Sequence, residues 1–270
     1  MTVTRFAPSP TGNLHLGHAY SALYSERVAK ENGGKFLLRI EDIDHTRCRS
    51  EHIKNIYDDL EWLGIVWESN VIVQSSRLDF YKEAANKLNA RGLLYPCFCT
   101  RKDIAESAER TVDNANAVYS GKCLKLTEEE IAEKMSKGLP YSLRLNSKRA
   151  KEETGKLFWN DQFSGVHEVN FDALGDIVLV RKDIGTSYHL AVTLDDDLQD
   201  VTCVTRGVDL YESTHVHRIL QALLQLNVPE WSHHKLIKGV DGNKYSKSDQ
   251  SLTLKELRGS GVSAREIRKE

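Results

Sequence analysis

Two histidines near the start of the chain, His15 and His18, have the spacing and the setting of a phosphate-binding pair. They follow residues 7–14, in which two prolines and Gly12 rule out regular structure. Residues 3–6 indicate the end of a short strand, and after His15 apolar residues recur with helical spacing. A strand, a loop and a helix N-terminus in this order are where α/β proteins bind phosphates.

Because the two imidazoles are three residues apart, we expect them on one face of the first helical turn. There they could donate hydrogen bonds to phosphoryl oxygens whose charge grows during substitution at phosphorus. Gly17 between them has no side chain, so adenine could approach the backbone closely. The alternative is that both are ordinary surface histidines on a capped helix.

Two lysines late in the chain, Lys244 and Lys247, could act on the same phosphates. They follow a glycine-containing turn, and two ammonium groups three residues apart could clamp a polyphosphate and follow a leaving pyrophosphate. A solvated basic turn is the alternative. A similar run at residues 134–138 is rejected, because Ile131 and Met135 fall on one face of a helix that is still running there.

The composition limits the classes of protein to which the chain could belong. The chain has 270 residues and a net charge of -2, so any basic surface for nucleic acid must be local. No apolar run approaches the roughly 20 residues that span a bilayer. Residues 1–4 lack the charged and apolar segments of a signal peptide. Five cysteines, an odd number, argue against a disulfide framework. We therefore expect a cytoplasmic protein. We also expect a monomer, although composition itself does not bear on oligomeric state.

Strands and helices alternate over the first 94 residues. Strands are expected at residues 35–40 and 71–74, and helices begin at Ser50 and Ser76. Glu41 follows the strand at 35–40, at the sheet edge where ligands sit. The alternation resumes with strands at 186–192 and 201–206 and a helix at 211–226. This order predicts an α/β fold with a doubly wound parallel sheet.

The stretch between these two parts reads as an inserted α+β module. It contains a capping box at Thr127 and Glu130 and shorter strands at 141–145, 156–163 and 177–181. We expect a catalytic domain split over residues 1–94 and 185–232, the inserted module at 95–184, and a lysine loop with a short helical C-terminal stem at 233–270.

The two loops together resemble the HIGH and KMSKS signatures of class I aminoacyl-tRNA synthetases, with Tyr245 in place of methionine. Residues 5–12 are similar to the start of the glutamyl/glutaminyl branch. The resemblance implies a Rossmann-type catalytic domain that forms an aminoacyl-adenylate from ATP and Mg²⁺. It implies catalytic roles for His15, His18, Lys244 and Lys247, and ATP binding by His15, Gly17, His18 and Lys247.

The same resemblance implies a pocket for L-glutamate. Two arginines suit carboxylates, one carboxylate suits the ammonium group, and a tyrosyl hydroxyl suits orientation. Taken singly, an arginine in an ion pair or a tyrosine in a core would explain these residues equally well. Val192 departs from the asparagine usual in glutamyl-tRNA synthetases, which predicts glutamate binding weaker by ~1–2 kcal/mol. The implied pocket residues are Arg5, Phe6, Ala7, Pro8, Ser9, Glu41, Tyr188 and Arg206.

Three cysteines, Cys97, Cys99 and Cys123, fall within 27 residues of the inserted module. The spacing C-x-C is a weak zinc signal and a structural zinc ion takes four ligands, so buried free thiols are the first interpretation. The pattern nevertheless resembles the zinc site of truncated glutamyl-tRNA synthetase paralogues. That resemblance implies one structural Zn²⁺, with Tyr119 as the fourth ligand.

Only 22 residues follow Ser248, so we expect no anticodon-binding domain. This layout also resembles the truncated paralogues, which implies transfer of glutamate to the queuosine base in the anticodon of tRNA-Asp. The alternatives are a minimal glutamyl-tRNA synthetase that charges tRNA-Glu, a non-catalytic tRNA-binding paralogue, and a simple nucleotidyltransferase sharing H-x-G-H. The last would not need the glutamate-pocket residues.

Overall fold

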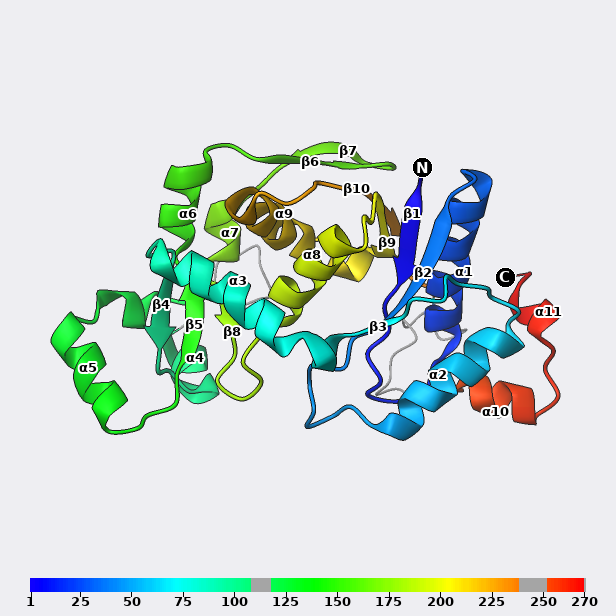
Figure 1. The fold of residues 1–270 in the computed structure, drawn as a ribbon, viewed down its shortest axis with the longest axis horizontal. Coiled ribbons are helices and arrows are strands. Elements are labelled where there is room, and N and C mark those ends of the chain that lie inside the picture. The colour runs from blue at the N-terminus through cyan, green and yellow to red at the C-terminus, as the bar shows by residue number, and fades with distance from the viewer. Residues whose placement is uncertain (108–117, 238–251, 270) are drawn as a thin grey trace.

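Parallel strands form the centre of the molecule in the computed structural model, which describes residues 1–107, 118–237 and 252–269 (Figure 1). The strands β1 (Val3–Phe6), β2 (Lys35–Ile40) and β3 (Ile72–Val73) pair in parallel. So do β9 (Cys203–Gly207), β10 (Glu230–His234) and β6 (Phe158–Asp161), with β7 (Gly165–Glu168) antiparallel at the edge. The Thr202 N–H donates to the Val3 carbonyl at 3.0 Å, which places β9 beside β1.

Helices pack against these strands through buried apolar side chains. The expected helices after Ser50 and Ser76 and over 211–226 are confirmed, and the first helix begins directly after His15. Their buried aliphatic and aromatic side chains form two core clusters, one on β1 and β2 and one around β9 and β10. The helices are α1 (Leu16–Glu31), α2 (Ser50–Trp62), α3 (Leu78–Ala90), α8 (Tyr188–Leu198) and α9 (Ser213–Leu224).

The strand expected at residues 186–192 is wrong, since this segment begins α8. The Ser187 side chain caps the helix by accepting from the Leu190 N–H. Seven consecutive residues of α8, 190–196, are buried. A helix buried on all sides has no amphipathic period, so its apolar run could not be distinguished from that of a buried strand.

A separate sheet is antiparallel and comes almost entirely from the segment expected as an insertion. It consists of β4 (Leu94–Cys97), β5 (Ser142–Leu145) and β8 (Val178–Val180). The capping box at Thr127 is confirmed, and α5 (Glu128–Ser136) holds most of the rejected run at 134–138. The strands β6 and β7 fall within residues 95–184 but join the sheet of β9 and β10. The remaining elements are α4 (Arg101–Ser107), α6 (Ser147–Thr154), α7 (Phe171–Leu174) and the 3-10 turns Gln74–Arg77, Lys122–Lys125 and Val208–Leu210.

The C-terminal stem is helical, as expected, with α10 (Leu254–Gly259) and α11 (Ala264–Ile267) beside α2 (Figure 1). It contacts the histidine loop, residues 7–18, directly, because the Leu254 N–H donates to the Leu14 carbonyl at 2.8 Å. Arg268 forms an ion pair with the buried Glu26 at 3.0 Å. None of the described helices is both long and apolar enough to cross a membrane.

Candidate active site

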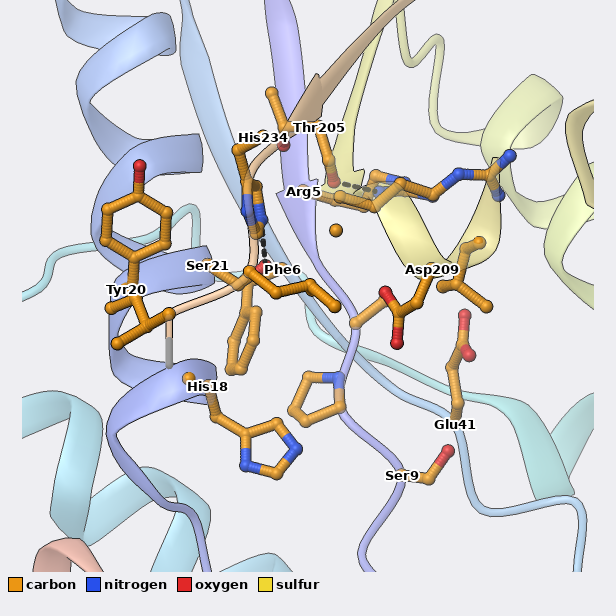
Figure 2. A pocket seen from close by; sticks show the side chains of 18 of the residues that line it. Arg5, Phe6, Ser9, His18, Tyr20, Ser21, Glu41, Thr205, Asp209 and His234 are labelled. Carbon is orange, nitrogen blue, oxygen red and sulfur yellow. Dashed lines mark hydrogen bonds between the residues drawn. The ribbon is translucent and has the colours of Figure 1, made fainter. Parts of the chain in front are cut away.

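One cavity of about 450 Å³ opens where the carboxyl ends of β1, β2 and β9 meet the start of α1. Its position follows from the parallel sheet, whose strands all deliver their following loops to the same edge. Figure 2 shows His18 on one side of this cavity and Arg5 and Glu41 on the other. All described residues expected to bind glutamate or ATP line it: Arg5, Phe6, Ala7, Pro8, Ser9, His15, Gly17, His18, Glu41, Tyr188 and Arg206.

The histidine pair is held by the helix N-terminus that it caps. The Nδ1 atom of His15 accepts from the Gly17 N–H at 3.1 Å, and the Nδ1 atom of His18 accepts from the His15 N–H at 3.2 Å. The rings lie 3.8 Å apart, so the expectation that they share one face is confirmed. Since both Nδ1 atoms accept, each neutral ring carries its hydrogen on Nε2. His15 and His18 therefore present their Nε2–H donors at the positive end of the α1 helix dipole.

Arg5 and Glu41 belong to a buried network of alternating charges. The carboxylate of Asp196 on α8 accepts from Arg5 Nε at 2.8 Å and from Arg39 Nη2 at 2.7 Å. Arg39 also donates to Glu41 Oε1 at 3.2 and 3.3 Å. Burial raises the pKa of Glu41, although Arg39 and Arg5 oppose that shift. The network fixes a carboxylate and an arginine side by side at the cavity wall.

Arg206 on β9 and Tyr188 on α8 form another part of the wall. Arg206 is 4% exposed, and it donates to the imidazoles of His217 and His233. Burial raises the pKa of Tyr188, so its hydroxyl stays protonated beside the Arg206 guanidinium. The cavity wall therefore carries the guanidinium groups of Arg5 and Arg206 and the carboxylates of Glu41 and Asp209. It offers cationic groups for the carboxylates and anionic groups for the ammonium group of an acidic amino acid.

Several residues of this site were missed from the sequence. Asp196 and Arg39 hold the network together, and His217 and His233 contact Arg206, yet none has a motif of its own. The acidic run at 195–197 within a buried apolar stretch was the available signal for Asp196. Val192 is 1% exposed and is not among the residues that line the cavity.

The lysines of the second predicted loop, Lys244 and Lys247, lie outside the described residues, so their roles stay predictions. The chain nevertheless re-enters the described part at Leu252, close to the histidine loop, because Thr253 forms a β-bridge with His15. Lys247 therefore comes shortly before Thr253 in the sequence, and Thr253 pairs with His15.

The three cysteines lie together with Tyr119 at the end of β4. The ligand atoms of Cys97, Cys99 and Cys123 lie within 4.8 Å of one another, and Cys99 Sγ is 3.5 Å from Cys123 Sγ. The Tyr119 hydroxyl is 3.4 Å from Cys97 Sγ and 3.5 Å from Cys99 Sγ. The Arg144 guanidinium covers the Tyr119 ring at 3.9 Å. All five cysteines of the chain are free thiols.

Comparison with known proteins gives one consistent family. A family model described as tRNA synthetases class I (E and Q), catalytic domain, matches residues 1–268. The chain is 43% identical to a protein of Rhodobacter capsulatus named glutamyl-Q tRNA(Asp) synthetase, over 99% of this chain and 98% of that protein. It is 38% identical to the glutamate–tRNA ligase of Coprothermobacter proteolyticus, over 96% of this chain and 55% of the ligase.

Solved structures agree with this similarity. A glutamate tRNA ligase from Elizabethkingia meningosepticum, crystallised in complex with its amino acid, superposes with a TM-score of 0.75 at 28% identity. The match covers 96% of this chain and 53% of that protein. The chain thus spans about half the length of the glutamate–tRNA ligases that it matches, and nearly all of the Rhodobacter protein.

Proposed function

Because the chain belongs to the class I tRNA synthetases of the glutamate and glutamine branch, we propose that it activates L-glutamate with ATP and transfers it to queuosine in the anticodon of tRNA-Asp. Its fold is the catalytic fold of that class, α/β with a parallel sheet. The observation that carries the activation step is the single cavity in which two arginines, Glu41 and the histidine pair meet. The similarity to the Rhodobacter protein along nearly its whole length supports the acceptor.

In the first step the α-carboxylate of glutamate attacks the α-phosphorus of ATP, and pyrophosphate leaves. Arg206 and Arg5 hold glutamate by its carboxylate charge, while Glu41 accepts hydrogen bonds from its ammonium group. The Nε2–H groups of His15 and His18 donate to the phosphoryl oxygens as their charge grows.

ATP enters as its magnesium complex, and Lys244 and Lys247 stabilise the leaving pyrophosphate. In the second step a hydroxyl of the acceptor nucleoside attacks the glutamyl carbonyl of the adenylate, and AMP leaves. The acceptor hydroxyl loses its proton as the new ester forms.

The cysteine cluster suits one structural zinc ion. A tetrahedral ion with Zn–S bonds of about 2.3 Å separates two sulfur ligands by roughly 3.8 Å, and a sulfur from an oxygen ligand by roughly 3.5 Å. The distance of 3.5 Å between Cys99 Sγ and Cys123 Sγ and those of 3.4–3.5 Å from sulfur to the Tyr119 oxygen are close to these separations, and all three sulfurs lie within 4.8 Å of one another. Cys97, Cys99, Cys123 and Tyr119 would hold the ion and fasten β4 to the turn at Cys123. The ion would stabilise the segment without taking part in the reaction.

A second candidate is a glutamyl-tRNA synthetase that charges the end of tRNA-Glu. The identity of 38% to a glutamate–tRNA ligase over 96% of this chain favours it, since the activation chemistry is shared. The two functions differ only in the hydroxyl that receives glutamate.

Exchange of labelled pyrophosphate into ATP tests the activation step. With purified protein, with and without tRNA, we expect exchange that depends on glutamate and is lost in Lys247→Ala while the fold is retained. Equal exchange rates in Lys247→Ala and the parent would refute the role of this lysine. No glutamate-dependent exchange in the parent under either condition would refute the proposed activity and favour a non-catalytic tRNA-binding protein.

A further inference from the structure

Three buried arginines differ in what their guanidinium groups contact: Arg5 and Arg206, which line the cavity, and Arg39, which lies behind its wall. Arg5 and Arg39 both form ion pairs with Asp196, at 2.8 and 2.7 Å. Arg206 is as buried as Arg5, with 4% exposed in both cases. Within the described part of the chain, however, no carboxylate forms an ion pair with Arg206. A buried cation without a carboxylate partner is costly, so this arrangement requires an explanation.

Neutral groups contact Arg206 instead. Its Nε donates to His233 Nε2 at 3.2 Å, its Nη1 donates to His217 Nδ1 at 3.2 Å, and its Nη2 donates to the Thr214 hydroxyl. A guanidinium has five N–H donors and no acceptor, so both imidazole nitrogens must present lone pairs to it. These three bonds fix the plane of the group, and two of its five N–H donors remain for the neighbouring Tyr188 hydroxyl and a ligand.

Because these two nitrogens accept from Arg206, the tautomers of His217 and His233 are determined. His233 carries its hydrogen on Nδ1 and donates it to Asp161 Oδ2 at 2.8 Å. His217 carries its hydrogen on Nε2 and donates it to His189 Nδ1 at 3.2 Å. The other Asp161 oxygen accepts from the N–H groups of the β6–β7 turn at 3.0 Å. The hairpin and α8 therefore both hold the rings that orient Arg206.

The surroundings keep both rings neutral. Burial and the nearby Arg206 charge hold the pKa of His217 well below its usual range. The same two causes lower the pKa of His233 to about 4, although Asp161 opposes them. At neutral pH the two rings accept hydrogen bonds from Arg206 without cancelling its charge.

We propose that His217 and His233 are positioning residues that orient Arg206 with neutral acceptor nitrogens, so that its charge is left for a side-chain carboxylate and glutamate is preferred to glutamine. This inference rests on the proposed function and deepens it. A carboxylate in the cavity gains the full attraction of an unpaired cation at low dielectric, whereas a carboxamide gains only hydrogen bonds. A carboxylate at position 217 or 233 would pair with Arg206 and remove that difference.

Two variants of His217 isolate the effect of charge. The side-chain oxygen of Asn or Asp occupies nearly the position of a histidine Nδ1 atom, and the two residues have the same shape. His217→Asn keeps a neutral acceptor beside Arg206, while His217→Asp replaces it by an anion. His233→Gln and His233→Glu form the matching pair for an Nε2 acceptor. His167→Asn is the control, because His167 contacts Trp159 and Ser164 but not Arg206.

Dissociation constants of L-glutamate and L-glutamine, measured by calorimetry, give the preference for each folded variant. We expect His217→Asn, His233→Gln and the control to keep the parent's preference for glutamate within about threefold. We expect His217→Asp and His233→Glu to lower it at least tenfold. Equal preferences in His217→Asn and His217→Asp would overturn the inference.

If neither acidic variant folds, the neutral variants decide. His217→Ala lacks the acceptor, so we expect its KM for glutamate in pyrophosphate exchange to rise about tenfold relative to His217→Asn with kcat little changed. Equal KM values, or a loss confined to kcat, would overturn the positioning role.

Binding and exchange also distinguish the two proposals. Parent protein that prefers glutamate in calorimetry but shows no exchange would refute the proposed activity and leave the inference standing. Parent protein that binds glutamate no better than glutamine would overturn the inference whatever the exchange assay gives.

Discussion

The proposed glutamate pocket is built from residues distant in sequence and the cysteine cluster from residues 97–123, and the two satisfy their polar groups differently. In the pocket, the charged groups of Arg5, Arg39 and Asp196 contact one another at 2.7–3.2 Å before any ligand binds. In the cluster, three thiols and a phenol contact each other at 3.4–3.5 Å, and the phenol also accepts from the Cys123 N–H at 2.9 Å. Thiols are weak hydrogen-bonding groups, so these contacts contribute little stability. The pocket is thus preorganised by its own chain, whereas the cluster would depend on the zinc ion that we propose for it.

Removal of the metal should have the largest effect, because a structural zinc ion stabilises its fold by about 10 kcal/mol. We expect one zinc per chain by atomic absorption, and its loss in Cys123→Ser. Hydrogen exchange in β4 and the turn at Cys123 should then accelerate, while exchange in β1 and β9 stays slow. Metal-free protein with unchanged exchange in β4 would make the cluster a set of buried free thiols.

Breaking the pocket network comes next. Asp196→Asn leaves Arg5 and Arg39 buried with less compensation, so we expect the free energy of unfolding to fall by about 3–5 kcal/mol. Asp58→Asn, which removes only the exposed pair with Lys54, should change it by less than about 1 kcal/mol. Urea denaturation of both variants measures the difference. Similar losses in the two would contradict the view that the network preorganises the pocket.

The nucleotide side of the cavity should respond in rate rather than in stability. His18→Ala removes one Nε2–H donor from the transition state, so we expect kcat for pyrophosphate exchange to fall about 10²–10³-fold. The dissociation constant of glutamate should change little, since His18 lies across the cavity from Glu41 (Figure 2). A rise in that constant with kcat preserved would instead place His18 in the amino-acid site.

Acid should weaken the pocket through its neutral histidines. An unfolded chain protonates imidazole below about pH 6.5, whereas the pKa of His233 in the fold is about 4. The free energy of unfolding should therefore fall as pH drops from 6.5 to 4, by up to about 3 kcal/mol from this residue. We expect His233→Gln to show a smaller decrease over that window in urea denaturation. Parallel pH profiles would indicate that His233 is protonated in the fold.

The smallest effect concerns a buried carboxylate outside both regions. Asp59 on α2 has no hydrogen-bond partner for either carboxylate oxygen, and its ion pair with Arg258 spans 3.7 Å. Burial raises its pKa to about 6, so the ionised form is disfavoured in the fold. We expect Asp59→Asn to stabilise the protein at pH 8 by about 1 kcal/mol, with the gain lost below pH 4. Destabilisation at pH 8 would show that the Arg258 pair contributes more than burial costs.

How much could be predicted depended on whether a signal was local. His15, His18, Arg5 and Glu41 stand in short patterns next to a strand or a helix end, and the structure brings them into one cavity. The role of Asp196 depends on contacts with residues 157 and 191 positions away. No period or motif encodes such a distance.

The wrong and missing predictions also follow from signals that are absent in the local sequence. α8 was expected to begin as a strand because burial on every side removes the helical period. His217 and His233 belong to no motif in the sequence, since the role that we propose for them depends on which nitrogen faces Arg206. The module boundaries at 95 and 184, the zinc ion and the cytoplasmic location stay predictions, as do the roles of Lys244 and Lys247.

Transfer of labelled glutamate to tRNA tests the central proposal most directly. The protein is incubated with ATP, labelled glutamate and tRNA-Asp, with or without queuosine, and with tRNA-Glu in parallel. Removal of the terminal adenosine from each tRNA before the reaction blocks charging at that end and leaves the queuosine base intact. We predict acid-precipitable label only on queuosine-containing tRNA-Asp, retained after this removal. Label confined to intact tRNA-Glu and abolished by the removal would contradict the account and make the protein a minimal glutamyl-tRNA synthetase.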